Sequence, residues 1–137
     1  MTSQDNKALD QQFVEQVFNN NKSELFKNFY APEIVDQMLV DATMLRKAFP
    51  DLHYIIEDQI AEEDKVVTRW TASGTHRGEL VSNQHPHSPA ILPTGKRVSW
   101  GGVTISRLAG GKYVEQWNNV DMLSVLQQLG AIHLSSL

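Results

Sequence analysis

The sequence predicts one α+β domain, in which N-terminal helices pack on a strongly curved antiparallel sheet. Three observations lead to this fold class. Apolar residues recur at helical spacing through the first third of the chain, and after Pro50 they alternate with polar residues as in strands. A short apolar stretch then ends at Gly130, in the position of a C-terminal helix cap. With 137 residues, the chain suits a single domain over residues 1–137.

The first predicted helix carries Leu9, Phe13 and Val17 on one face. Asp10 and Glu15 are assigned to its opposite, polar face. The asparagine run that follows is typical of a helix end. We therefore expect an amphipathic helix whose apolar face meets the rest of the core.

Two further helices are predicted before the sheet. Ser23 is placed to cap a short second helix, and Pro32 stands where a first-turn proline starts a third. Asp41 is placed to cap a separate turn or two, which Phe49 and Pro50 end.

Four antiparallel strands follow, with Gly110 and Gly111 forming a tight hairpin between the last two. A segment rich in proline interrupts them and is predicted to be an irregular loop. Helices gathered on one face of such a sheet make a cone-shaped α+β barrel, which encloses a cavity suited to a small ligand. The predicted ranges are strands at 52–60, 65–75, 97–108 and 113–120, the loop at 80–93 and a final helix at 122–129.

Composition excludes several classes of function. A net charge of −4 argues against nucleic-acid binding, which needs a basic surface. No stretch is long and apolar enough for a membrane span, and the first residues do not form a signal peptide. The chain has no cysteine, which removes disulfides and thiolate chemistry. We expect a cytoplasmic protein without membrane partners.

Histidines give little sign of a metal site. His85 and His87 form an H-x-H pair, but they lie on a proline-broken loop without a third ligand in view, so solvated side chains are favoured. His53 has a strand setting in which a pocket imidazole is possible, although an exposed or packed side chain is the favoured interpretation. No metal is expected.

Four segments in a fixed order carry a resemblance to a known family. They are AFPDLHYIIEDQIAEEDKVVTRWTASGTHRG, PTGKRVSWGGVTISRL, GGKYVEQWNNVD and MLSVLQQLG, and an opening FVEQVFNNNKSELFKNFYAPEIVDQ adds a helix pair. Together they resemble the SnoaL-like polyketide cyclases, also called ester cyclases, of the nuclear-transport-factor-2-like superfamily. The resemblance implies an α+β barrel, a homodimer or homotetramer, and no metal or organic cofactor.

The resemblance also implies residue roles, and these transfer only in part. The cyclases close a ring by proton transfer, with a catalytic aspartate that falls at Asn118 here, and an amide is no general base at neutral pH. Assisting histidines fall at Thr104 and Gln116, and a pocket residue of the third helical segment falls near Asp36 or Gln37. The resemblance therefore implies the fold without the aldol mechanism.

Asp121 is the obvious substitute acid, because it ends the last strand. The favoured alternative is that Asp121 caps the final helix by accepting from its free amides. Arg69 is predicted either to bind an anionic substrate group or, slightly favoured, to pair with Glu57 or Glu115 across the sheet.

Aromatic and amide side chains on the strands are the remaining candidates. Trp100 is as well suited to a pocket wall as to the core, whereas Trp117 is predicted to be a core residue. Gln116 and Asn118 share a face by alternation, and the resemblance points that face at the cavity. Their amides suit a bound carbonyl or hydroxyl.

Two functions from different classes remain open. The first is binding of a small hydrophobic or aromatic carbonyl compound with cofactor-free cyclase or isomerase chemistry. In it Asp36 or Asp121 is the base, while Gln116, Asn118 and Arg69 polarise the substrate. The second is binding without catalysis. An epoxide-hydrolase-like enzyme is a further alternative, which needs an Asp–Arg–Asp cluster around a water.

Overall fold

Helices come first and the sheet follows, as predicted. The computed structural model describes residues 1–81 and 89–132. The helical segments are α1 (Ser3–Phe13), a π-helix (Val14–Asn19), a 3-10 turn (Ser23–Leu25), α2 (Phe26–Phe29) and α3 (Pro32–Ala48). The remaining elements are β1 (His53–Glu62), β2 (Lys65–Thr75), β3 (Arg97–Ala109), β4 (Lys112–Val120) and α4 (Met122–Gln128).

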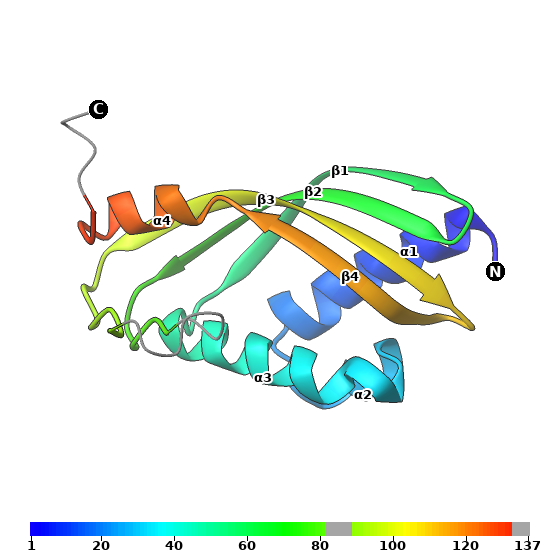
Figure 1. The fold of residues 1–137 in the computed structure, drawn as a ribbon, viewed down its shortest axis with the longest axis horizontal. Coiled ribbons are helices and arrows are strands. Elements are labelled where there is room, and N and C mark those ends of the chain that lie inside the picture. Colours follow the sequence, from blue (N-terminus) through cyan, green and yellow to red (C-terminus); the bar gives the residue numbers. More distant parts are fainter. Residues whose placement is uncertain (82–88, 133–137) are drawn as a thin grey trace.

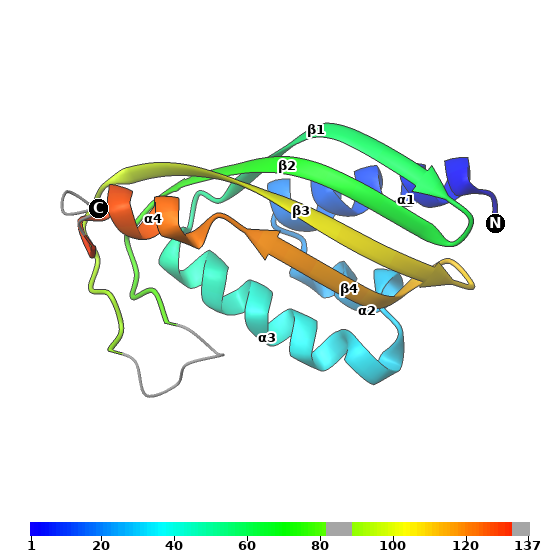
Figure 2. The same ribbon diagram turned by 45° about the horizontal axis from the view of Figure 1, so that its top comes forward.

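The four strands lie in chain order, β1-β2-β3-β4, and each is antiparallel to its neighbours. Irregularities between Ile56 and Asp58 in β1 and between Arg107 and Leu108 in β3 add bend to the sheet. Helices α1, α2 and α3 cover one face of the curled sheet, and α4 follows the end of β4 (Figures 1 and 2). The predicted α+β class, with helices on a strongly curved antiparallel sheet, is confirmed.

The helix boundaries differ from the predictions at two places. Helix α3 runs without a break through Asp41, because Pro32 starts it and its apolar positions keep helical spacing to Ala48. The predicted cap at Asp41 is therefore wrong. Ser23 lies inside the 3-10 turn, whose N-cap position is Lys22, so Ser23 is not the cap of a longer helix.

The first helix continues as a π-helix rather than ending cleanly. Its wider turns are closed by bonds such as the 2.9 Å one from the amide of Asn20 to the carbonyl of Glu15. π-Helical segments are rare in proteins, and those that occur often lie at functional sites. Here the π-helix includes Val14 and Phe18, which line the cavity described below.

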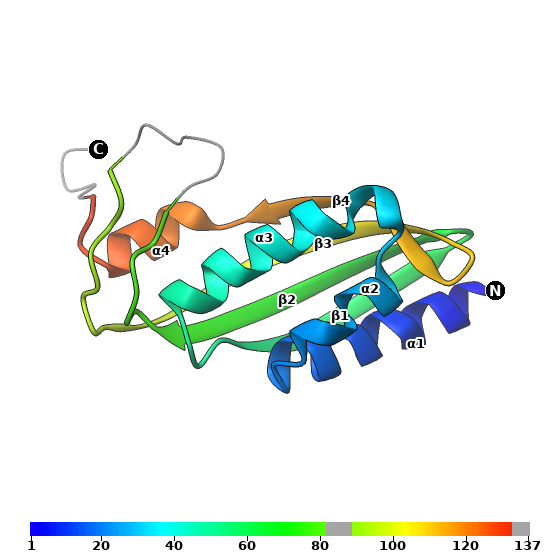
Figure 3. The ribbon, with the colours of Figure 1, turned by 90° about the horizontal axis from the view of Figure 1, so that it is seen from below.

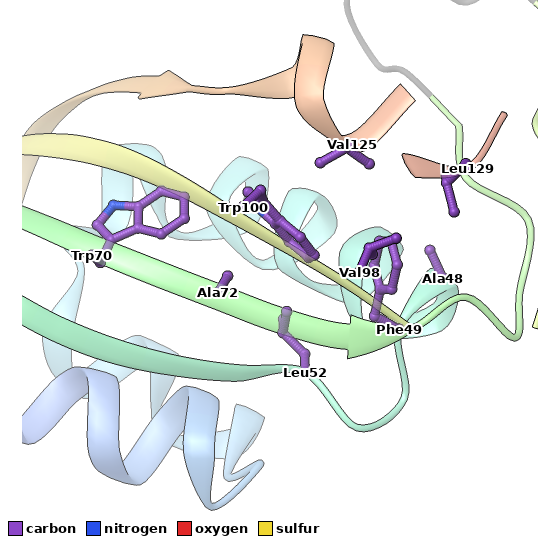
Figure 4. Packing of buried hydrophobic residues seen from close by; sticks show 9 residues of the cluster. All are labelled: Ala48, Phe49, Leu52, Trp70, Ala72, Val98, Trp100, Val125 and Leu129. Atoms are coloured by element: carbon purple, nitrogen blue, oxygen red, sulfur yellow. The ribbon is translucent and has the colours of Figure 1, made fainter. Parts of the chain in front are cut away.

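Two apolar clusters fill the space between sheet and helices. Near α4, the rings of Phe49 and Trp100 lie 5.0 Å apart, and Val125 and Leu129 of the α4 region pack against them (Figure 4). At the other end Phe13 is the centre of an aromatic group, with ring centroids 5.2–5.7 Å away. Its neighbours are Phe26, Phe29, Tyr30 and Tyr113.

The opposite face of the sheet carries an apolar row. Ile60, Val67, Ile105 and Trp117 are direct partners across all four strands. Ile60 is 70% exposed and Trp117 is 48% exposed, so the predicted core role of Trp117 is wrong. Seen from below, helices α1, α2 and α3 lie in front of the sheet (Figure 3), and Figure 1 shows no helix of the described part of the chain over the opposite face.

Candidate functional site

A cavity of about 300 Å³ lies between the inner face of the sheet and the helices. Alternation along the strands turns every second side chain of β2, β3 and β4 toward it, and one stripe of α3 faces it from the other side. Its walls are mainly aromatic and aliphatic, which is typical of a site for an apolar small molecule. Aromatic walls are supplied by Phe18, Phe26, Tyr30, Tyr54, Trp70 and Trp100.

Gly102 on β3 leaves room for one of these aromatic walls, the indole of Trp70. A Cβ atom at Gly102 would lie 2.4 Å from Cζ2 of Trp70, so the indole occupies the space that a side chain on β3 would take. In this position the indole Nε1 donates a 2.8 Å hydrogen bond to Oγ1 of Thr104. The packing of Trp70 against a bare backbone thus brings its one polar atom to the cavity wall.

From Thr104 the hydrogen bonding continues to the next strand. Oγ1 of Thr104 donates a 2.6 Å bond to Oδ1 of Asn118, its direct partner on β4. The carbonyl end of the Asn118 amide is therefore occupied, while its Nδ2 group makes no hydrogen bond to the described residues. Because Asn118 lines the cavity, the two N–H bonds of Nδ2 are the donors left for a ligand.

Gln116 also lines the cavity, but both ends of its amide are used. Its Oε1 accepts a 2.6 Å hydrogen bond from the Tyr30 hydroxyl, and its Nε2 donates a 2.9 Å bond to Oγ of Ser106. Burial raises the pKa of Tyr30 above its ordinary range, with a further rise from the nearby Asp10 carboxylate. Gln116 therefore positions Tyr30 and is a weaker candidate for a direct ligand contact than Asn118.

The structure adds a cavity residue that the sequence did not single out. Asp10 was assigned to the polar face of the first helix, yet its side chain is buried, 4% exposed, and lines the cavity. Its Oδ2 accepts hydrogen bonds from Oγ1 of Thr68 (2.6 Å) and Nε2 of Gln59 (2.8 Å), and its Oδ1 accepts one from the Tyr113 hydroxyl. Burial, then the Asp10 charge, raises the pKa of Tyr113 well above its ordinary value. Spacing held a signal, because Asp10 lies three and seven residues before the buried Phe13 and Val17.

The two predicted bases lie elsewhere. Asp121 caps α4, where its Oδ1 accepts a 3.1 Å bond from the amide of Ser124, so the predicted helix-cap role is confirmed. Asp121 is not among the residues that line the cavity. Asp36 is exposed on α3 and also lies outside it. The reason is helical spacing, because the cavity stripe of α3 runs through Met38, Asp41, Ala42 and Leu45.

Three further predicted site residues lie outside the lining. Gln37 is exposed and donates a 3.0 Å bond to Oδ1 of Asp41. Arg69 points to the outer face and pairs at 2.8 Å with Asp58, not with Glu57 or Glu115, because the irregularity in β1 sets Asp58 opposite it.

His53 is exposed at the start of β1 and, paired with Ser73, faces outward as well. Of the predicted ligand-contacting residues, Thr104, Gln116, Asn118 and Trp100 are brought together at the cavity.

Neither a metal centre nor a membrane span is found in the part of the chain that the structure describes. Among residues 1–81 and 89–132 there is no group of three or more His, Asp or Glu side chains placed to hold a metal ion. His85 and His87 lie outside these ranges. In the same ranges, no helix has the length and apolar character needed to cross a membrane.

Comparisons with known proteins agree with the fold. Residues 8–129 match the family model described as SnoaL-like polyketide cyclase. Among solved structures, AclR from Streptomyces galilaeus, a candidate hydroxylase, has 30% identity and a TM-score of 0.82, covering 96% of this chain and 84% of AclR. A candidate polyketide cyclase from Acidithiobacillus ferrooxidans has 25% identity and a TM-score of 0.77, covering 94% of this chain and 96% of its own.

A candidate SnoaL-like polyketide cyclase from Jannaschia sp. CCS1 has a TM-score of 0.82 at 19% identity, covering 96% of this chain and 95% of its own, and supports the fold alone. Comparison with curated proteins gave no match.

Proposed function

Because the chain belongs to the SnoaL-like polyketide cyclase family, we propose that it binds a small hydrophobic carbonyl compound in the cavity between sheet and helices. The Asn118 amide carries this proposal. Thr104 holds its oxygen, so the Nδ2 donors are the end that meets a ligand. An amide donor against an aromatic wall suits a carbonyl oxygen on a flat apolar molecule.

We propose binding without proton abstraction as the activity of the natural chain. The resemblance puts the family's catalytic aspartate at Asn118, and an amide does not take a proton from carbon at neutral pH. Asp36 and Asp121 stay candidate bases for a cyclase or isomerase, but their places outside the lining weaken that alternative. An epoxide-hydrolase-like reaction has no arginine among the cavity-lining residues of the described chain.

The proposal is tested by calorimetric titration with 2-acetylnaphthalene, an aromatic ketone. We expect saturable binding by the natural chain and an affinity roughly fivefold lower for Asn118→Ala, because one neutral hydrogen bond is lost. Asn119→Ala is the matched control, since Asn119 is the next residue on β4 and pairs with Val103 on the outer face. Equal loss in both variants, or no saturable binding by the natural chain, would refute the proposal.

Likeness to AclR supports a second candidate, hydroxylation of an aromatic ligand in the same cavity. Incubation with the same ketone, molecular oxygen and NADH, followed by mass spectrometry, tests it. A product heavier by one oxygen atom supports hydroxylation, and unchanged ketone leaves binding as the function.

We further propose a homodimer in the cytoplasm. The support is the outer face of the sheet, where Ile60, Val67, Ile105 and Trp117 form an apolar row in register. Its two ends, Ile60 and Trp117, are exposed, and the two middle residues are half-buried. On either side of the row, Arg69 pairs with Asp58 and Arg107 with Glu115, so the face balances its own charges. A second copy of the same neutral apolar face suits this surface better than a nucleic acid or an anionic membrane does.

A further inference from the structure

Besides the exposed Asp41 of α3, the cavity is lined by one further carboxylate among the described residues, that of Asp10 on α1, which is a second polar point besides Asn118. Its side chain is 4% exposed. Placing a carboxylate against apolar walls is costly unless its oxygens receive hydrogen bonds. Gln59 of β1, Thr68 of β2 and Tyr113 of β4 supply three, which fix the carboxylate in one orientation.

These bonds leave acceptor capacity unused. A carboxylate has about four acceptor positions, and the three donors occupy both positions on Oδ2 and one on Oδ1. A purely structural link between α1 and the strands explains the three bonds. It does not explain why the carboxylate lines the cavity, where the remaining position on Oδ1 can meet a ligand.

The two polar points are separated across the sheet. Asp10 is bonded to Thr68 on β2, Thr68 is paired with Thr104 on β3, and Thr104 is paired with Asn118 on β4. Two strand spacings therefore separate the Thr68 end from Asn118, roughly 10 Å. Trp70 is the next inward-facing residue after Thr68 on β2, and it contributes an aromatic surface between the two polar points.

We propose that Asp10 accepts a hydrogen bond from a hydroxyl or N–H group of the ligand, so that the ligand is an aromatic ketone with such a donor at the end remote from its carbonyl. This inference rests on the proposed function, because Asn118 must hold the carbonyl. The two points have opposite hydrogen-bonding character, an N–H donor on β4 and an oxygen acceptor on α1. They select both the class of ligand and its direction in the cavity.

Three related ketones test the inference by calorimetric titration: 6-hydroxy-2-acetylnaphthalene, its 6-methoxy analogue and 2-acetylnaphthalene. All carry the carbonyl, and only the first carries a donor at the remote end. We expect the hydroxy compound to bind about tenfold tighter than 2-acetylnaphthalene, because a hydrogen bond to a carboxylate is gained. The methoxy compound should bind more weakly than the hydroxy compound, since it brings an oxygen without a hydrogen.

Variants test whether Asp10 causes the tighter binding of the hydroxy compound. In Asp10→Asn the hydroxy compound should lose its advantage over 2-acetylnaphthalene, with the fold checked by circular dichroism. In Glu24→Gln, a change at an exposed carboxylate outside the cavity, the advantage should persist.

Equal affinities of the natural chain for the hydroxy compound and 2-acetylnaphthalene overturn the inference while the proposed function stands. Binding of none of the three overturns both. The comparison in the natural chain decides even where Asp10→Asn does not fold.

Discussion

Oγ1 of Thr104 donates a 2.6 Å hydrogen bond to Oδ1 of Asn118, its direct partner on the neighbouring strand. The same oxygen accepts a 2.8 Å bond from the indole of Trp70. The three side chains therefore form a directed series from β2 to β4, and its last member presents a donor to the cavity. Removing the central hydroxyl should release the amide without changing the shape of the wall.

Thr104→Val is predicted to lower the affinity for 2-acetylnaphthalene by roughly fivefold, because the Asn118 amide is then free to turn its oxygen toward the carbonyl. The stability of the variant should also fall by about 1–3 kcal/mol, because the Trp70 N–H loses its acceptor. Calorimetric titration and urea unfolding measure the two effects. Thr71→Val is the matched control, since Thr71 lies on the same strand as Trp70 but bonds to Glu57 on the outer face. Affinity that falls equally in both variants would contradict the prediction.

Asn118→Asp is predicted to give the cavity a base. Thr104 already donates toward this position, so an aspartate there would be a held carboxylate on the cavity wall that can take a proton from a bound ketone. We expect the variant to accelerate exchange of the acetyl protons of 2-acetylnaphthalene in deuterated water, measured by proton nuclear magnetic resonance. The natural chain should leave the exchange rate at that of buffer. Exchange catalysed by the natural chain would count against binding as its function.

Asp10→Ala is predicted to destabilise the fold by about 3 kcal/mol or more, because Gln59, Thr68 and Tyr113 all lose an acceptor. Chemical unfolding monitored by circular dichroism gives the free energy of unfolding. Asp36→Ala is the control, since Asp36 is exposed on α3, and it should change stability by less than about 0.5 kcal/mol. Similar free energies for the two variants would show that the buried network adds little.

The buried tyrosines lead to a prediction about tyrosine ionisation and unfolding at alkaline pH. The chain has three, Tyr30, Tyr54 and Tyr113, and burial raises the pKa of each above the ordinary value of 10.0. Because the pKa of each phenol is higher in the folded state than the ordinary value of 10.0, the stability that the neutral, buried phenols contribute is complete below pH 10.0. It is lost as the pH rises further, since the unfolded chain ionises first. Tyrosinate absorbance should therefore stay low near pH 10.0 and rise only together with the loss of circular dichroism.

Tyr54→Phe gives the control for this titration. It should remove one third of the absorbance change, because Tyr54 is one of three tyrosines, while the rise still coincides with unfolding. A tyrosine that ionises near pH 10.0 with the circular dichroism intact would show that at least one phenol is accessible in the folded protein.

Ile60→Asp is predicted to convert a dimer into a monomer, because it places a charge in the apolar row of the outer face. Sedimentation velocity at several protein concentrations measures the change. Val40→Asp is the matched control, since Val40 is 50% exposed on α3, away from the sheet. A natural chain that sediments as a monomer at every concentration would refute the dimer.

Periodicity was enough to predict the fold, because each strand and the main helices bury one regular face. It also placed Asn118, Gln116 and Thr104 at the cavity with the help of the resemblance. Strand alternation also gives the outward orientation of Trp117, although the prediction of a core residue did not take it into account. If Gln116 and Asn118 face inward, the residue between them must face outward, where Trp117 is found.

Helical spacing put Asp10 on the side of the buried Phe13 and Val17, but it could not justify the burial of a carboxylate. A carboxylate on an amphipathic helix is normally read as part of the solvated face, and only its partners justify its burial. Those partners, Gln59, Thr68 and Tyr113, are 49, 58 and 103 residues away along the chain. No local pattern contains these partners, so the hydrogen bonds that stabilise a buried Asp10 are found only when sheet and helix are assembled.

The bond from Thr104 to Asn118 also has an evolutionary consequence. Codons for asparagine and aspartate differ by a single nucleotide, and the Thr104 hydroxyl already donates to the position that an aspartate oxygen would take. The gene for this chain is therefore one base transition from a gene whose product has a carboxylate at that point. A single substitution of similar size, and no rearrangement of the fold, therefore separates an amide from a carboxylate at this place in the cavity wall.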